Sequence, residues 1–340
     1  MSKIFLTKPP IFNEELWRFY NRNLVVKSVT ICQFRRLTNE FMKSNILKYT
    51  TLLLTLTGFV NCESKSQLAT SKNNKSLLWE ITGNELQKPA YIYGTMHLMC
   101  KQDAVLSDNL KKIIRDVDEI YFEIDMDDLG QLLSGFSMGT MKNNTTLNEL
   151  YSSEEFERIS HFFESHGMGM QLQMFQKMQP MLISALVYQA ILPCSAADGI
   201  ELNIMQVAHD HKKEIKGLET AAFQASVLES IPYKTQAKEL LYSIDNLDST
   251  EAESEKMMAL YKEQDLEKLL DFSLKTDGGT TSDVQDVMIN QRNKSWVEKF
   301  PDISKNKSLL IAVGAGHLGG QAGVLNLLKE KGYQLRPVEN

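Results

Sequence analysis

The segment Ala90-Tyr-Ile-Tyr-Gly-Thr-Met-His97 joins a short apolar run to a glycine and then a histidine. The pattern returns in Ser308-Leu-Leu-Ile-Ala-Val-Gly-Ala-Gly-His317, again with two residues between the glycine and the histidine. Apolar runs of this length, rich in Val, Ile and Tyr, are typical of strands buried on both faces of a parallel sheet. Glycine at a strand exit allows a sharp turn and a close approach to a ligand. The sequence therefore predicts two buried strands, each with a histidine at its carboxyl end, where open α/β sheets bind ligands.

Further apolar runs alternate with helical patterns along the chain. We expect strands at 77–82, 90–95, 118–125, 214–218, 308–314 and 333–338. Helices are expected at 107–115, at 126–141, from 152, at 168–192 with a break at Pro180, at 198–211, from 219, at 232–277 as a helical hairpin over the sheet, at 283–299 and at 319–331. This alternation predicts a single α/β domain over 77–340, with a mostly parallel central sheet, flanking helices and a helical insertion in the middle.

The composition is that of a globular protein whose main partner is not nucleic acid. Of the 340 residues, 43% are hydrophobic and 24% are charged, and the formal net charge is −6. Binding to nucleic acid phosphates needs a basic patch, and the chain contains no block of Lys and Arg.

The segment ending at Cys62 has the pattern of a bacterial lipoprotein signal. A short basic stretch is followed by the uncharged run 49–60, which is too short to span a membrane and typical of a signal peptide. We expect Cys62 to carry a lipid, so that the protein is exported and anchored to a membrane of the bacterial cell envelope. The alternative is a plain secretory signal in which Cys62 has no such role. The expected segments are 1–41, which is not part of the mature protein, 42–61, which is the signal, and 62–76, which is a polar tether.

Export would leave Cys100 and Cys194 as the cysteines of the folded domain. Two thiols in an oxidising compartment can form a disulfide. The sequence gives no distance between them, so a disulfide and two buried free thiols both stay open.

Three side chains at the ends of expected strands could form one metal site. His97 and His317 follow the two glycines, and Glu123 lies in the apolar run Tyr121-Phe-Glu-Ile-Asp125. A carboxylate in such a run is costly to bury unless it is paired or bound to a metal. Two neutral imidazoles and a carboxylate are a common ligand set for a divalent ion. Asp125 has the same parity as Glu123, so we expect it to lean to the same face.

The alternatives for these three residues are structural. Each histidine could be a hydrogen-bonded residue without a ligand, and Glu123 could form an ion pair with Arg292. Arg292 itself could stabilise an anionic transition state, or it could be a surface arginine. Glu219 follows a short expected strand and could be a ligand or a base, or an acid that favours a helix N-terminus. The sequence contains no His-Glu-x-x-His, Gly-x-Ser-x-Gly, phosphate-loop or dinucleotide-binding pattern, so those enzyme classes have no support.

These residues lie in motifs whose order resembles the TraB/GumN family, which is related to the Tiki metalloproteases. The motifs are Leu77-Leu-Trp-Glu-Ile81, Tyr93-Gly-Thr-Met-His97, Phe122-Glu-Ile-Asp125, Asp198-Gly-Ile200, Gly217-Leu-Glu-Thr220, Gln291-Arg-Asn-Lys-Ser-Trp296 and Val313-Gly-Ala-Gly-His317, with Gly332-Tyr333 near the end. The resemblance implies an α/β fold similar to erythromycin esterases. It implies that His97, Glu123 and His317 are metal or catalytic residues, and that Glu219 and Arg292 belong to the same site.

The expected function is a lipid-anchored, metal-dependent hydrolase, most simply a peptidase with a peptide or protein substrate. The expected cofactor is a divalent ion such as Mn, Co or Zn. Two other functions stay open. One is a non-catalytic surface lipoprotein that binds a peptide or a metal-containing ligand, and the other is an esterase-like hydrolase of a non-peptide substrate.

Overall fold

The computed structural model describes residues 75–194, 197–276 and 282–340. The expected signal, the lipid attachment site Cys62 and the tether up to residue 74 lie outside these residues. Among the helices that are described, none is both long and apolar enough to cross a membrane.

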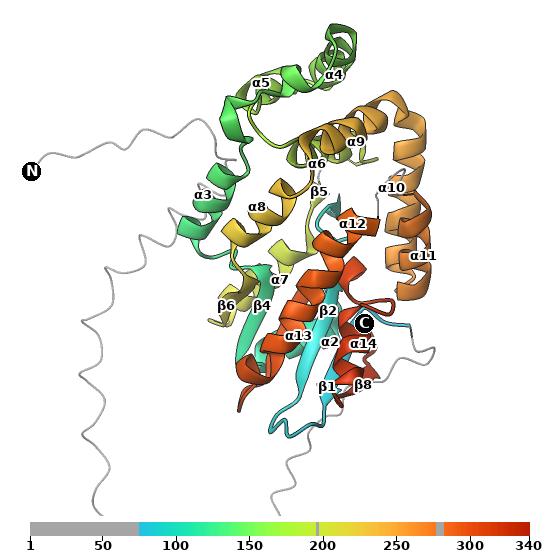
Figure 1. Cartoon of the computed structure of the whole chain (residues 1–340). Helices are drawn as coiled ribbons and strands as arrows, with labels where there is room; N and C mark the ends of the chain where they lie inside the picture. The colour runs from blue at the N-terminus through green and yellow to red at the C-terminus, as the bar shows by residue number, and fades with distance from the viewer. Residues whose placement is uncertain (1–74, 195–196, 277–281) are drawn as a thin grey trace, which may run out of the picture. The chain divides into compact units, whose positions relative to one another are not determined.

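A six-stranded sheet forms the centre of the domain, in the order β6-β4-β7-β2-β1-β8 (Figure 1). Strands β6, β4, β7 and β2 are parallel neighbours, whereas β1 is antiparallel to both β2 and β8. The predicted fold class, α/β with a mostly parallel central sheet, is therefore confirmed. The strands are β1 (Leu78–Thr82), β2 (Ala90–Thr95), β4 (Glu119–Ile124), β6 (Glu214–Glu219), β7 (Leu309–Gly314) and β8 (Gln334–Pro337).

The pairing of β2 with β7 brings the two Gly-x-x-His segments to the same edge of the sheet. Gly94 lies opposite Val313 and Thr95 lies opposite Gly314, so the two strands end at the same level. Strand β4 pairs with the other side of β7, and β6 pairs with β4. Since parallel strands direct their carboxyl ends the same way, all four strands end at the edge where α/β sheets bind ligands.

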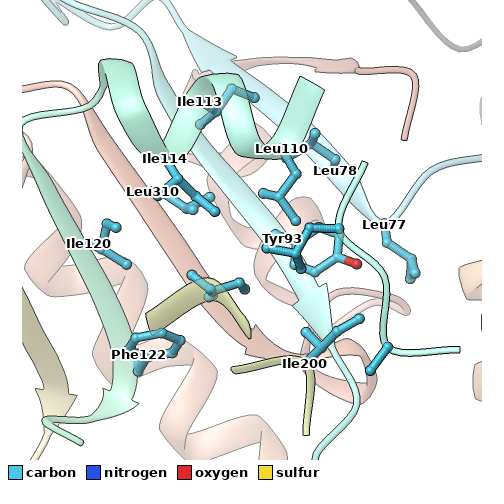
Figure 2. Close-up of a cluster of buried hydrophobic side chains, with 14 of the residues drawn as sticks. Leu77, Leu78, Tyr93, Leu110, Ile113, Ile114, Ile120, Phe122, Ile200 and Leu310 are labelled. Atoms are coloured by element: carbon cyan, nitrogen blue, oxygen red, sulfur yellow. The ribbon is translucent and has the colours of Figure 1, made fainter. Parts of the chain in front are cut away.

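Helices cover both faces of the sheet. On one face, α2 (Asp108–Asp116) and α7 (Ile200–Asp210) contribute to a buried cluster with strand residues such as Phe122 (Figure 2). On the other face, α13 (Gln291–Ile303) and α14 (Val324–Glu330) pack against Ile92 and its neighbours. Burying each large apolar side chain stabilises the fold by about 1.5–3 kcal/mol. The strand ends are therefore held by a packed core on each side.

A helical insertion has a hydrophobic core of its own. Helices α4 (Ser153–Ser165), α5 (Gly169–Met174), α6 (Pro180–Ile191) and α9 (Tyr233–Asp245) meet around Phe163, Val187 and Leu240. Figure 1 shows α4, α5, α6 and α9 grouped away from the central sheet. The predicted insertion in the middle of the chain is confirmed. Further α-helices in the described residues are α3 (Leu129–Met138), α8 (Ala221–Glu229), α10 (Leu247–Lys262), α11 (Leu266–Thr276) and α12 (Ser282–Gln285).

Some expected helices have different boundaries. The break expected at Pro180 is confirmed, because 168–192 forms the two helices α5 and α6, and Pro180 lies in the first turn of α6, where its fixed φ suits a helix start. The described part of the expected hairpin, residues 232–276, forms the three helices α9, α10 and α11, so the prediction of a two-helix hairpin was wrong. The expected helix 319–331 begins only at Val324, after a loop in which Gly320 has φ +82°. The expected helix 283–299 contains a π-helical turn, η3 (Asp286–Asn290), between α12 and α13.

Cys100 and Cys194 form a disulfide across 94 residues of sequence. Cys100 belongs to the short strand β3 (Met99–Cys100), which pairs with β5 (Ala197–Asp198). The disulfide and this small sheet join the segment after β2 to the segment before α7. The chain after His97 is thereby fixed, and the chain before it is held by the pairing of β2 in the central sheet.

Replacing both cysteines by alanine should lower the free energy of unfolding by about 2–5 kcal/mol, because the disulfide restricts the unfolded chain. Chemical denaturation with and without a reductant measures the change. The control is the double variant, whose unfolding midpoint should not respond to the reductant. An unchanged midpoint when the unmodified protein is reduced would show that the two cysteines are not paired.

Candidate functional site

Four neighbouring strands place polar side chains at one edge of the sheet. Glu123 is the last residue but one of β4, and Glu219 is the last residue of β6. His97 comes just after β2, and His317 lies in the turn Ala315–His317 that follows β7. Residues separated by up to 220 positions in the sequence therefore meet at one place.

His97, His317 and Glu123 face one another across this edge. The Nε2 atom of His97 lies 3.9 Å from Oε1 of Glu123, and Nε2 of His317 lies 3.7 Å from the same oxygen. The backbone N–H of Gly314 donates a hydrogen bond of 2.9 Å to this oxygen. Both imidazoles thus direct the same nitrogen to one carboxylate oxygen.

Two glycines make this approach possible. A Cβ atom on Gly94 would lie 2.9 Å from Cδ1 of Leu318 and 3.1 Å from Cα of Ala315. A Cβ atom on Gly199, the residue before α7, would lie 2.6 Å from the backbone oxygen of His97. A side chain at either position would push apart the segments that carry the two histidines.

Each histidine is oriented through its Nδ1 atom. Nδ1 of His97 lies 2.5 Å from Oε1 of Glu201, and Nδ1 of His317 lies 2.6 Å from Oδ1 of Asn293. The amide nitrogen of Asn293 donates to the backbone oxygens of His317 and Ala322, which leaves Oδ1 as the acceptor for the imidazole. Both Nδ1 atoms therefore carry a hydrogen, and Nε2 is the atom that carries a second proton or binds a cation.

Arg292 is buried and joins the carboxylates. Its NH2 group donates to Oε2 of Glu123 at 2.5 Å and to Oε1 of Glu219 at 2.6 Å. Its NH1 group donates to the backbone oxygen of Met288, in the π-helical turn, and lies 3.3 Å from Nε2 of His317. Arg292 is 4% exposed, so the surface-arginine alternative was wrong. The ion-pair alternative for Glu123 is correct. The pair with Arg292 involves only Oε2, and Oε1 faces the two histidines.

Both carboxylate oxygens of Glu219 accept hydrogen bonds from neighbouring side chains. Its Oε1 accepts from Nε and NH2 of Arg292, and its Oε2 accepts from the indole N–H of Trp296 at 3.0 Å. The guanidinium of Arg292 also lies over the Trp296 ring, 4.9 Å from the centroid. Thr220, not Glu219, caps α8. The geometry therefore makes Glu219 a residue that positions Arg292.

Asp125 does not share the site. Its Oδ1 accepts from the backbone N–H groups of Asp127 and Asp128, in the exposed turn after β4. The strand ends at Ile124, so the alternation that would align Asp125 with Glu123 no longer applies. The expectation that the two carboxylates lean to the same face was wrong.

The surroundings set the charges of these groups. Burial opposes ionisation of Glu123, but the charges of the imidazoles and of Arg292 outweigh it and lower the pKa of Glu123 to about 2. Burial lowers the pKa of His317 to about 4, whereas the hydrogen bond to Glu201 raises the pKa of His97 to about 9. The side chain of His97 is 67% exposed, so water screens its pair with Glu201. Without a cation, His317 is neutral at pH 7 and His97 is charged.

Sequence reasoning missed three residues of the site. Glu201 and Asn293 hold the imidazoles, and Nε2 of Gln224 donates to Oε2 of Glu123 at 3.1 Å. Asn293 follows Arg292 in the motif Gln291-Arg-Asn-Lys-Ser-Trp296, so the motif is a signal in the sequence for its place in the site. Glu201 lies just after the motif Asp198-Gly-Ile200, but nothing in the sequence connects it with His97.

Two clefts open onto the site. The larger cleft, of about 620 Å³, contains His97, Glu123, Arg292 and His317 and has apolar walls from α6, α8, α10, α11 and η3. The smaller cleft, of about 390 Å³, contains His97, Glu123 and Glu201. A further cavity of about 660 Å³ contains none of these residues, so its size alone does not make it the functional site.

The donor set has the chemistry of a divalent-metal site but not its closed geometry. Two ligands bonded to one ion at about 2.1 Å each are at most about 4.2 Å apart. The 3.9 Å and 3.7 Å separations fall within that limit. Within the described part of the chain, no three His, Cys, Asp or Glu side chains are grouped closely enough to hold an ion as they stand. His97, His317 and Glu123 would have to move closer together, and the guanidinium would have to leave Nε2 of His317.

Comparison with known proteins gives one finding. The model of the TraB/PrgY/gumN family matches residues 77–337, which include all the strands of the central sheet and the whole site. Neither the curated proteins nor the solved structures gave a match. Because the match covers most of the chain, this protein belongs to the TraB/PrgY/gumN family.

Proposed function

We propose that the protein is a metal-dependent hydrolase that acts on a peptide bond. The observation that carries the proposal is the charge of the buried cluster. Glu123, Glu201 and Glu219 are three buried carboxylates, and Arg292 pairs with two of them, Glu123 and Glu219, whereas Glu201 pairs with His97. Without a cation, the proton on His97 leaves the cluster with a charge of −1 at pH 7. Once that proton leaves and both imidazoles are neutral, the charge is −2, which a divalent cation would balance. Buried charge is stable only when it is compensated in this way.

The residues have distinct roles in this proposal. His97 and His317 would hold the cation through Nε2, and Glu123 would either complete the ligand set through Oε1 or accept a proton from water. A divalent ion such as Mn, Co or Zn supplies a Lewis acid that lowers the pKa of water towards neutrality. Arg292 would stabilise the negative charge that develops on the attacked carbonyl oxygen. Glu219 would hold Arg292 in place for this step.

The two other functions use the same residues. A binding protein would hold a peptide or a metal-containing ligand in the clefts without turnover. An esterase-like hydrolase would act on a non-peptide substrate. The apolar larger cleft suits a peptide or an ester. Assays of peptide and ester hydrolysis distinguish the three functions: a peptidase cleaves peptides, an esterase cleaves esters, and a binding protein cleaves neither.

We propose that the protein works outside the cytoplasm, anchored through a lipid on Cys62. The short uncharged run 49–60 before this cysteine supports the anchor. The Cys100–Cys194 disulfide supports export, because disulfides persist in oxidising compartments.

Replacing His97 by alanine or His317 by glutamine should abolish metal binding and hydrolysis. Each loses a nitrogen that holds the cation, so kcat/KM should fall at least about 100-fold. Elemental analysis after loading with Mn²⁺, Co²⁺ or Zn²⁺ measures the metal, and a peptide library measures cleavage. Glu123→Gln separates its two roles: loss of a ligand lowers metal content, whereas loss of a proton acceptor leaves metal bound and removes turnover.

The matched control for these variants is His209→Ala. His209 is a histidine outside the site that pairs with Asp127, so metal content and activity should stay unchanged. Thermal unfolding of every variant shows whether the fold survives. Full activity in a protein that lacks both site histidines, or activity that exhaustive chelation does not affect, would refute the mechanism.

Cation affinity should rise between pH 6 and pH 9. The pKa of His97 is raised to about 9, so a proton must leave this imidazole before a metal can bind at neutral pH. The gain should be about tenfold for each pH unit, and calorimetry at pH 7 should detect about one proton released. Because the pKa of His97 is higher in the folded protein, about 9, than in the unfolded chain, about 6.5, the His97–Glu201 pair stabilises the metal-free fold. This stabilisation is complete below about pH 6.5 and is lost as the pH rises through about 9.

Glu201→Gln tests the cause of this pH dependence. Without the carboxylate, the pKa of His97 should return towards its ordinary value of about 6.5, and affinity should level off above that pH. An affinity that is flat from pH 6 to pH 9 in the unmodified protein would show that His97 does not bind the cation.

Cys62→Ser should release the protein from the membrane fraction or block its processing, because serine has no thiol to carry a lipid. Fractionation of expressing cells and mass spectrometry of the mature terminus measure this. Cys32→Ser is the matched control and should have no effect. The anchor is refuted if the Cys62→Ser variant stays in the membrane fraction and the unmodified protein carries no lipid.

A further inference from the structure

We propose that an apolar surface on helices α3 and α5 lies in the phospholipid headgroup layer of the membrane to which the protein is anchored. The inference goes beyond the proposed hydrolysis and rests on the proposed anchor at Cys62. We call this feature the apolar outer surface. It consists of the exposed side chains of Leu129, Leu133, Phe136, Met138, Met170 and Met174.

Helix α3 turns an apolar face away from the domain. None of its ten residues is buried, and Leu129, Leu133 and Phe136 are 60%, 62% and 55% exposed. These three positions have the i, i+4, i+7 spacing of one helix face. The opposite face packs closely on α8, where a Cβ atom on Gly135 would lie 2.7 Å from Cβ of Ala221 (Figure 1). The apolar face is therefore the outer one, where a surface helix ordinarily carries charged or polar side chains.

Helix α5 extends this apolar face. The rings of Phe136 and Phe175 meet edge to face with their centroids 6.2 Å apart, which places α5 beside the end of α3. Met170 and Met174 lie one helical turn apart and are 73% and 55% exposed. Single exposed apolar side chains are ordinary, but a group of them on two neighbouring helices marks an interaction surface.

Both helices belong to segments without charged side chains. Residues 129–141 and 167–176 contain no Asp, Glu, Lys or Arg. A water-exposed surface gains nothing from this composition, whereas every charged side chain would be costly in an apolar layer. The composition therefore suits a surface that is removed from water.

Two lysines lie at the border of the apolar outer surface. Lys142 and Lys177 directly follow the two uncharged segments, and the backbone N–H of Met141 donates to the backbone oxygen of Lys177 at 2.7 Å. The Lys142 side chain is 72% exposed, and its pair with Glu229 at 3.3 Å is a weak one. Lysines at such a border keep the ammonium group among lipid phosphates while the methylene groups lie against the apolar layer.

The size of the surface favours a membrane over a second copy of the chain. A stable protein interface takes about 20–30 residues from each partner, far more than this surface offers. Shallow insertion of a few apolar side chains suffices where an anchor already holds the domain at the bilayer, because the anchor raises their effective concentration there.

The proposed anchor is close enough to the domain for this contact. Cys62 precedes Lys75, the first described residue, by 13 positions. An extended chain of this length spans at most about 45 Å. A domain of this size is about 45–50 Å across, so the tether does not keep α3 away from the bilayer.

Fluorescence quenching by brominated lipids tests the inference at one position. The full protein with Phe136→Trp is reconstituted into vesicles of phosphatidylethanolamine and phosphatidylglycerol with brominated acyl chains. The introduced tryptophan should lose at least about half of its emission, because the apolar face of an interfacial helix lies about 5–10 Å deep. Subtracting the emission of the unmodified protein removes the contribution of its own tryptophans.

The matched control is Val105→Trp. Val105 is 67% exposed and lies outside α3 and α5, so the tryptophan introduced there should keep its emission. Equal quenching at the two positions, or no quenching at position 136, would overturn the inference. A blue shift at position 136 that needs no vesicles and grows with protein concentration would assign the surface to a second copy of the chain and would also overturn it.

A charge on the same face should weaken the contact. Leu133→Asp in the Phe136→Trp protein should reduce the quenching at least about twofold, whereas Leu133→Phe should preserve it. Peptide cleavage in detergent solution should be the same in both variants, because Leu133 and Phe136 line neither cleft of the site. Equal quenching of the two variants would refute the contact.

Cys62→Ser separates the contact from the anchor. Flotation with vesicles that depends on Cys62, without quenching at position 136, would leave the anchor in place and refute the apolar outer surface as a membrane contact. Quenching that persists after Cys62→Ser would support the contact and show that it does not need the anchor. A protein with an intact Cys62 that neither floats nor is quenched would refute both.

Discussion

The pairing of Arg292 with two buried carboxylates is the interaction on which the rest of the site depends. It links β4, through Glu123, to β6, through Glu219, and to the helix that also carries Asn293. Removing one partner of a buried ion pair costs about 3–5 kcal/mol, because the other charge stays buried without compensation. Arg292 is therefore a structural centre as well as a candidate for stabilising negative charge. The guanidinium neutralises only part of the cluster, and the charge of His97 beside Glu201 offsets a further part.

Strand order then determines which residues meet at this centre. Strands β2 and β7 are far apart in the sequence, yet they are parallel neighbours whose ends lie at one level. The repeated Gly-x-x-His pattern consequently becomes a pair of imidazoles whose Nε2 atoms lie 3.9 Å and 3.7 Å from one carboxylate oxygen. The β3–β5 pair and its disulfide then fix the segment after His97 against the start of α7, which carries Glu201.

The sequence sufficed to predict the sheet, the helical insertion and the meeting of His97, His317 and Glu123, because these follow from apolar runs and glycine exits. It did not reveal Glu201 or Asn293, since an imidazole's second partner is set by the packing of a distant helix. Asp125 was misjudged because strand alternation stops where the strand ends. The π-helical turn before Arg292 has no sequence signature, although its Met288 carbonyl accepts from the guanidinium. Local patterns thus gave the elements, while tertiary contacts decided the hydrogen-bond partners.

The surroundings of Glu123 favour one of its two possible roles. Arg292 and Gln224 hold Oε2, and the Gly314 N–H holds Oε1 beside the imidazoles, so the carboxylate has little freedom to rotate. An efficient general base has a pKa near the working pH, whereas that of Glu123 is lowered to about 2. A permanently ionised, fixed carboxylate is a poor proton acceptor but a good ligand for a hard cation. In the proposed mechanism, the same hydrogen bonds that compensate the burial of Glu123 therefore favour the role of ligand over that of base.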